Sequence, residues 1–63
     1  MTVNGPTSHY DGQTVQEVLT ALAFRMGRII VEYNGKILSK ADWESTRVSA
    51  ADTMEVVTFV GGG

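Results

Sequence analysis

Residues 54–60 read MEVVTFV, and Gly61, Gly62 and Gly63 follow at once. β-branched and aromatic residues fill most of the first stretch, which is typical of a β-strand. Glycine has no side chain to pack in a sheet, so the strand should stop where the glycines begin. The sequence therefore predicts a folded domain over residues 1–60 whose last strand runs directly into a flexible glycine tail.

A helix is predicted well before this strand. Thr14 and Glu17 form a capping box, in which the Thr14 hydroxyl can accept from the Glu17 amide while the Glu17 side chain reaches back. Apolar residues then recur at the spacing of one helical face, at Val15, Val18, Leu19, Leu22 and Met26. We expect the regular part to stop near Ala23, Phe24 to turn back toward the core, and Gly27 to close the helix in the left-handed conformation.

Two hairpins are predicted at Asn-Gly pairs, because these residues supply the positive φ of tight turns. Asn4-Gly5 separates two short apolar segments of a first hairpin that ends at Asp11-Gly12. Asn34-Gly35 joins the β-branched run 29–33 to the segment 36–38. In that run, the residues of the core face should be Ile29, Val31 and Tyr33.

A short helical turn and a little strand are predicted between the second hairpin and the last strand. Ser39 is placed to cap a turn over 39–44, and residues 46–48 can add the strand. Trp43 is interpreted as packing for this turn, with a role as an interface anchor as the alternative. The resulting order of elements predicts an α+β fold of the β-grasp, or ubiquitin-like, kind. In this fold one main helix packs on one face of a mixed sheet of four to five strands.

Composition narrows the possible partners. The chain has no Cys and one His, so neither a disulfide nor a usual structural zinc site is expected. The formal net charge is -2, and the five Lys and Arg residues are interspersed with acids, so we expect no nucleic-acid partner. Apolar runs such as 29–31 are far too short for a membrane span, and the first residues lack the pattern of a signal peptide. We therefore expect a cytoplasmic protein that does not bind a membrane.

A catalytic centre of the chain's own is not expected. His9 is the lone histidine, and its neighbour Ser8 would point to the opposite face of a strand, which is the wrong geometry for a nucleophile and its base. His9 is therefore interpreted as a surface residue. No glycine-rich phosphate loop precedes a helix. We expect no catalytic residues, no bound metal and no bound cofactor.

The tail at 61–63 is the part to which we assign a chemical role. Three glycines can thread a narrow channel that any Cβ would block, and they let the Gly63 carboxylate bend toward a reacting phosphate. An enzyme can join this carboxylate to AMP from ATP, and sulfur can then attack the acyl adenylate to leave a thiocarboxylate. A frayed end or a cloning remnant is the alternative for glycines at a terminus. The direct junction with the last strand favours the functional interpretation.

Four runs of the sequence resemble the thiamine-biosynthesis sulfur carriers of the ThiS family. They read TVQEVL at 14–19, VEYNG at 31–35, WESTRV at 43–48 and EVVTFVGGG at 55–63. The ending TFVGGG on so short a domain is the most specific part of this resemblance, which covers almost the whole chain. It implies that Gly63 carries sulfur and that Gly61 and Gly62 thread the active sites of partner enzymes.

The same resemblance implies a cycle with three protein partners. A ubiquitin-activating-enzyme-like adenylyltransferase (ThiF) uses ATP to adenylate Gly63, a cysteine desulfurase or another donor supplies sulfur, and thiazole synthase (ThiG) accepts it for the thiazole of thiamine. The chain would then be a protein cosubstrate and not an enzyme. Two alternatives stay open: a carrier for molybdopterin or another thiolated product, and a ubiquitin-like modifier or interaction module.

The last strand also offers a surface for a partner. If Met54, Val56 and Thr58 face the helix, then Val57 and Phe59 lie on the opposite face, which is usually solvated in such sheets. We expect Val57 and Phe59 to contact the adenylating enzyme. The alternative is that loops cover this face or that the two apolar side chains have no partner.

Overall fold

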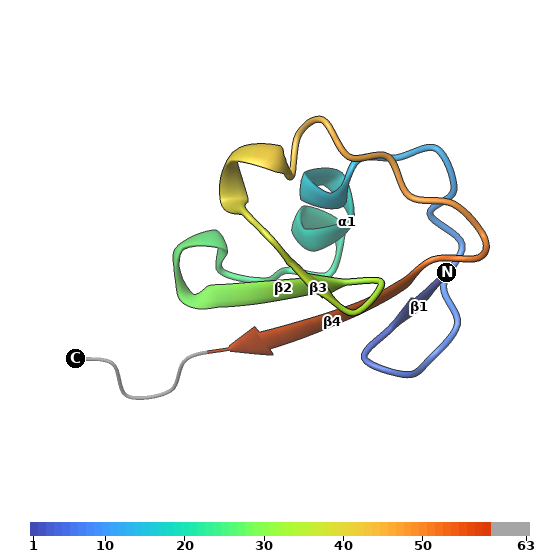
Figure 1. Cartoon of the computed structure of the whole chain (residues 1–63), viewed down its shortest axis with the longest axis horizontal. Coiled ribbons are helices and arrows are strands. Elements are labelled where there is room, and N and C mark those ends of the chain that lie inside the picture. Colours follow the sequence, from blue (N-terminus) through green and yellow to red (C-terminus); the bar gives the residue numbers. More distant parts are fainter. Residues whose placement is uncertain (59–63) are drawn as a thin grey trace.

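The computed structural model describes residues 1–58 of the 63-residue chain apart from the side chain of Met26, whose predicted place in the helix stripe therefore lies outside the described part. The strands are β1 (Thr2–Val3), β2 (Ile29–Tyr33), β3 (Lys36–Leu38) and β4 (Thr53–Thr58). The helical elements are the α-helix α1 (Val15–Ala21) and the 3-10 turns η1 (Met26–Arg28) and η2 (Lys40–Asp42). Figure 1 shows α1 and the η2 segment on the same side of the sheet.

The described strands form one mixed sheet in the order β1-β4-β2-β3. β1 runs parallel to β4, and β2 is antiparallel to both β4 and β3. One α-helix on one face of a four-stranded mixed sheet is the β-grasp arrangement, so the predicted fold is confirmed (Figure 1). Over residues 1–58, no helix has the length and apolar content that a membrane crossing requires.

The capping box of α1 is present as predicted. The Glu17 amide donates to the Thr14 hydroxyl at 3.1 Å, and the Thr14 amide donates to the Glu17 carboxylate at 2.8 Å. Each partner thus satisfies a backbone amide of the other at the point where the helix begins.

The regular part of α1 stops near Ala23, as predicted, but Gly27 does not close it. Ala23, whose φ of 63° lies in the left-handed region, closes the helix, whereas Gly27 belongs to η1. The Phe24 amide donates to the Leu19 carbonyl at 3.1 Å, as in a Schellman motif. Leu22, which was predicted to belong to the buried apolar stripe, is 37% exposed. Phe24 turns back and packs against the core, as predicted.

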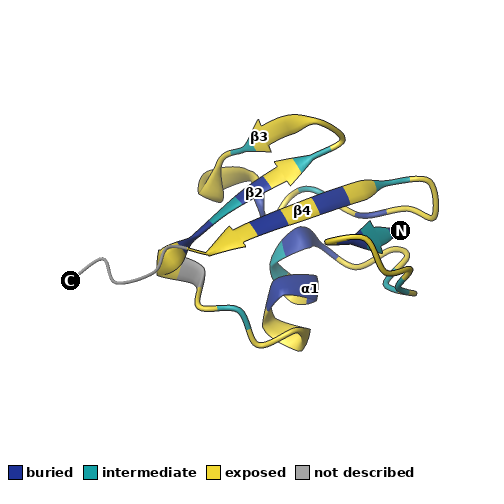
Figure 2. Ribbon diagram, turned by 90° about the horizontal axis from the view of Figure 1, so that it is seen from below, coloured by how far each residue is buried: buried dark blue, intermediate teal, exposed yellow. Residues whose placement is uncertain are grey.

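The core lies between α1 and the sheet. Its buried apolar residues are Met1, Val3, Val15, Val18, Leu19, Ile29, Val31, Trp43, Val48, Met54 and Val56. Figure 2 shows the alternation of buried and exposed positions along β4. Trp43 is 2% exposed and its Nε1 donates to the Leu38 carbonyl at 3.2 Å, which confirms its interpretation as packing for the helical turn. Tyr33 is partly buried beside Ile29 and Val31, so the predicted core face of β2 is also correct.

The first hairpin is present but short. Thr2 and Thr7 form an antiparallel bridge, the Ser8 amide donates to the Met1 carbonyl at 2.7 Å, and the Val3 amide donates to the Pro6 carbonyl at 3.0 Å. Pro6 has no amide to donate in return.

The predicted strand at 46–48 is wrong. This segment bonds to the loop before α1 instead of to the sheet, and it forms one isolated bridge.

The second hairpin matches its prediction. Asn34 and Gly35 have φ values of 52° and 84°, the positive values of a tight turn between β2 and β3. The following η2 turn lacks the expected cap, because the Ser39 hydroxyl donates to the Asp42 carboxylate at 3.3 Å and accepts no backbone amide.

Asp52 ties the second hairpin to the start of β4. Its carboxylate accepts from the Tyr33 hydroxyl and, at 3.1 Å, from the Asn34 side-chain amide. The hydrogen bond from Tyr33 holds the pKa of Asp52 below its ordinary value. Burial, together with the hydrogen bond and the charge of Asp52, raises the pKa of Tyr33 above its ordinary value. This group of hydrogen bonds between Asp52, Tyr33 and Asn34 is here called the Asp52 clamp. It is strongest while the Asp52 carboxylate is charged and the Tyr33 phenol is neutral.

Candidate functional site

The predicted site is the chain end beyond β4, and the structure shows how that strand is held. β4 lies between β1 and β2, so its first residues are paired on both sides. Met54 is fully buried and Val56 is 7% exposed, and both belong to the core. The strand is therefore fixed to the domain by its core face. It ends at Thr58, beside Ile29 of β2.

Asn4 continues the pairing of β4 after β1 has ended. Its Nδ2 donates to the Val56 carbonyl at 3.3 Å, and its Oδ1 accepts from the Val56 amide at 2.6 Å. Its backbone amide also donates to the Met54 carbonyl at 2.9 Å. The side-chain amide thus takes the place of a further β1 residue and satisfies backbone groups on the outer edge of β4. Sequence reasoning used Asn4 only as a turn residue, because no local pattern indicates a bond to a residue 52 positions away.

Four predicted site residues, Phe59, Gly61, Gly62 and Gly63, lie outside the described residues, so their roles stay predictions. The described part shows where β4 ends. Figure 1 shows that β4 begins beside β1 and ends at the opposite side of the sheet, beside the start of β2. The predicted site follows in the sequence after this Thr58 end of β4.

The open face of the sheet, on the side away from α1, carries exposed apolar side chains. Val57 is 49% exposed and Ile37 is 73% exposed, and Ile30 is the cross-strand neighbour of Val57. The predicted placement of Val57 opposite the core is confirmed, and no described loop covers it. Its contact with a partner stays a prediction.

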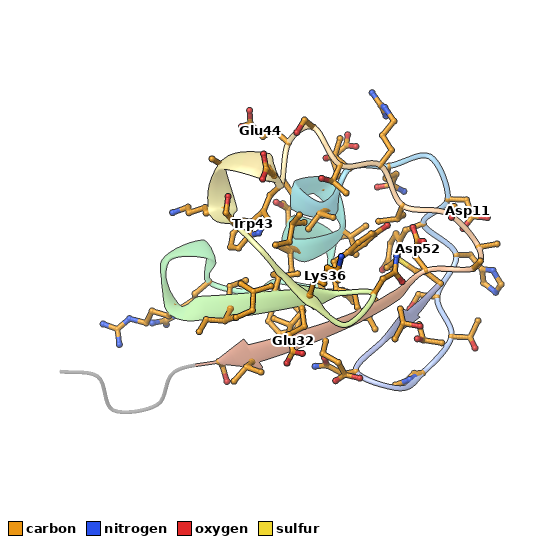
Figure 3. All side chains as sticks on the ribbon, viewed as in Figure 1. Asp11, Glu32, Lys36, Trp43, Glu44 and Asp52 are labelled. Atoms are coloured by element: carbon orange, nitrogen blue, oxygen red, sulfur yellow. The ribbon has the colours of Figure 1, made fainter. Side chains whose placement is uncertain are left out.

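Two carboxylates accompany these apolar side chains. Glu32 and Glu55 lie directly opposite each other across β2 and β4. Figure 3 shows Glu32 pointing away from α1, whereas Trp43 lies on the other side of the sheet beneath the η2 turn. Like charges that face each other across two strands destabilise a sheet slightly. The open face is therefore apolar with an acidic portion.

The titratable side chains with shifted pKa values in the described part lie apart from the Thr58 end of β4, in a small structural group. His9 is exposed, as predicted. Within residues 1–58, no group of three or more His, Asp or Glu side chains is arranged to hold a metal ion. The shifted pKa values of Tyr33 and Asp52 belong to the clamp at the start of β4, at the opposite end of the strand from Thr58. The features that this part offers are a firmly held strand and an exposed face.

This fold, with three glycines in the sequence shortly after the last strand, defines a ubiquitin-like β-grasp protein. The model of the ThiS family matches residues 1–63, which is the whole chain. The chain therefore belongs to the ThiS family.

Three relatives show the extent of this similarity. A thiamine biosynthesis protein (ThiS) from Geobacter metallireducens has the same fold, with a TM-score of 0.79 and 33% identity over 98% of this chain and 96% of that chain. The sulfur carrier protein ThiS of Bacillus subtilis (strain 168) is 34% identical over 53 residues, which cover 84% of this chain and 80% of that protein. A thiazole synthase of Paramagnetospirillum magneticum (strain ATCC 700264 / AMB-1) is 30% identical over 64 residues, which cover 100% of this chain and 20% of that protein.

Proposed function

We propose that this chain is a sulfur carrier for thiamine biosynthesis, and that its Gly63 carboxylate becomes a thiocarboxylate that donates sulfur to the thiazole. The match of the whole chain to the ThiS family carries the proposal. The similarity to the B. subtilis sulfur carrier supports it. In this role the chain is a protein cosubstrate and not an enzyme.

The chemistry takes place at the terminal carboxylate. A carboxylate oxygen of Gly63 attacks the α-phosphorus of ATP on the partner enzyme, and pyrophosphate leaves. A persulfide sulfur then attacks the carbonyl carbon of the acyl adenylate, and AMP leaves with the bonding electron pair. A thiol finally cleaves the S–S bond of the acyl persulfide, which releases the thiocarboxylate and leaves a disulfide. ATP is therefore consumed by the partner and is not a cofactor of this chain.

The glycines suit this chemistry because they present no side chain. Gly61 and Gly62 can follow an extended path through a narrow channel, and Gly63 can reach the phosphate without a Cβ that would obstruct it. The firmly paired β4 gives this tail a fixed starting point, which limits the positions that the carboxylate must search.

Two kinds of enzyme would act on the tail. An adenylyltransferase of the ThiF kind would bind the open face around Val57 and Phe59 and activate Gly63. A thiazole synthase of the ThiG kind would accept the sulfur. The second assignment is supported by the P. magneticum thiazole synthase, which contains a segment similar to the whole of this chain. A cysteine desulfurase or another persulfide donor would supply the sulfur.

Intact mass spectrometry tests this function. The chain is incubated with the adenylyltransferase, ATP and a cysteine desulfurase with cysteine, and the expected product shows replacement of one oxygen by sulfur. Transfer is then measured by adding thiazole synthase with its small-molecule substrates and following thiazole formation. Sulfur gain followed by transfer to molybdopterin alone would favour the other carrier function. An isopeptide bond to a protein in place of sulfur gain would identify a modifier.

A further inference from the structure

A notch opens at the edge of the sheet where β3 stops short of β2. β3 pairs with the last three residues of β2 and ends at Leu38, opposite Val31. The chain then turns into η2, so no β3 residue lies opposite Ile29 or Ile30. The space, here called the β3 notch, has a volume of about 250 Å³, and its lining includes Ile29, Ile30, Ile37, Leu38, Lys40 and Trp43.

The backbone of Ile29 is directed into the β3 notch. Tyr33 and Lys36 flank a two-residue turn, so they form a hydrogen-bonded pair of the β2–β3 ladder. Backbone groups alternate between the two sides of a strand, so Tyr33, Val31 and Ile29 all direct their N–H and C=O groups toward the β3 side. At Ile29 this side is the notch. An extended segment placed there can bond to both groups, as in β-strand addition.

The side chains around the notch indicate which segment fits. Ile29, Leu38 and Trp43 supply apolar surface, whereas Lys40 lines the notch with a cation and Arg28 immediately precedes Ile29. The volume is below the roughly 300 to 1,000 Å³ of pockets that enclose small ligands, so a peptide side chain suits it better than a cofactor. These features match an extended segment that combines an apolar residue with an acidic one.

Gly27 leaves the approach to the notch open. It lines the notch, and a Cβ added there would meet nothing within 4 Å. The notch is therefore not closed off at Gly27.

We infer that the β3 notch binds an extended acidic segment of the adenylating enzyme, which adds to the sheet as a short strand beside Ile29. The inference rests on the proposed function. On the other side of β2, Ile29 pairs with Thr58, the last described residue before the glycine tail in the sequence. The added strand would lie two interstrand spacings, about 10 Å, from β4. A partner held there is fixed beside the start of the segment that it must modify.

Charge reversal tests the role of the cation. Lys40→Glu is expected to weaken binding to the purified adenylyltransferase at least about tenfold, measured by calorimetry, because it places a carboxylate against the acidic segment. Lys36→Glu is the matched control. Lys36 is also exposed, but it lies at the turn end of β3 and does not line the notch. Both variants change the net charge equally, so a loss confined to Lys40→Glu reports local contact, and equal losses would contradict the inference.

Amide hydrogen exchange in the complex tests the added strand. The Ile29 amide should exchange at least about tenfold more slowly when the enzyme is bound. The Ile37 amide is the control, because alternation directs it to the outer edge of β3. Protection of Ile37 without protection of Ile29 would place the enzyme on β3 and overturn the inference.

Sulfur gain by the wild-type chain is followed in parallel. Failure to gain sulfur contradicts the proposed function. Normal sulfur gain with an unprotected Ile29 amide contradicts only the inference that the β3 notch binds the enzyme.

Discussion

The two ends of β4 are held in different ways. At its start, Met54 pairs with both β1 and β2, and Thr53 pairs with β1 while its amide donates to the Asn34 side chain at 2.9 Å. At its end, Val57 and Thr58 pair with β2 alone, and both are exposed. The start of the strand therefore supports the fold, while the end leaves side chains and backbone available to a partner.

Met54→Ala should produce the largest loss of stability, because it empties a fully buried position at the supported end. We expect the free energy of unfolding to fall by about 2 to 5 kcal/mol, a large part of the stability of so small a domain. Val57→Ala is the matched variant at the other end, and its effect should be below about 1 kcal/mol. Urea denaturation measures both. Equal losses at the two positions would abolish the contrast between the ends.

The same pair of variants separates stability from recognition. Val57→Ala should weaken binding to the adenylyltransferase, because it removes an exposed apolar side chain of the proposed contact face. Normal binding by a folded Val57→Ala protein would remove this residue from the interface.

Asn4→Gly should have an intermediate effect. It removes both hydrogen bonds to Val56, while glycine retains the positive φ that the backbone adopts at this position. We expect a loss of about 1 to 3 kcal/mol, because backbone groups of β4 lose their partner at this edge. Thermal unfolding gives the value, and an unchanged midpoint would show that water replaces the side chain at no cost.

The Asp52 clamp should give the smallest effect, seen as a dependence of stability on pH. The lowered pKa of Asp52 means that the folded state binds fewer protons than the unfolded state near pH 4. The clamp's contribution is therefore present above the ordinary Asp pKa of about 3.9 and is lost as the pH falls through the lower folded value. Between about pH 6 and about pH 3, the urea midpoints of Asp52→Asn and Tyr33→Phe should fall less than the midpoint of the wild-type chain. Glu44→Gln, which removes an exposed carboxylate, serves as the control.

Local signals account for what the sequence predicted well. The Thr14–Glu17 capping box and the Asn34-Gly35 turn depend on residues three positions apart or fewer, so their geometry follows from the local sequence. The alternation in β4 placed Met54 and Val57 on opposite faces, because the side-chain period of a strand is two.

Errors and omissions arose where the local pattern does not decide the structure. The stop of α1 near Ala23 was predicted, but Ala23 itself adopts the left-handed closing conformation that was expected of Gly27, because glycine is the usual residue there. Asn4 bonds to Val56 across most of the chain length, which no local pattern reports. The β3 notch likewise depends on where β3 stops relative to β2, and this is visible only once the strands are paired.

Removal of Gly63 tests the central claim most directly. One residue spans at most about 3.6 Å, and a misplacement of about 1 Å at a reacting centre can cost on the order of a hundredfold in rate. The shortened chain should unfold at the wild-type midpoint, yet intact mass after incubation with the adenylyltransferase, ATP and the sulfur donor should show little or no replacement of oxygen by sulfur. A chain with one alanine added after Gly63 should fail in the same way, because its carboxylate is displaced and carries a Cβ. If both altered chains gain sulfur at the wild-type rate, the terminal glycine carboxylate is not the sulfur carrier.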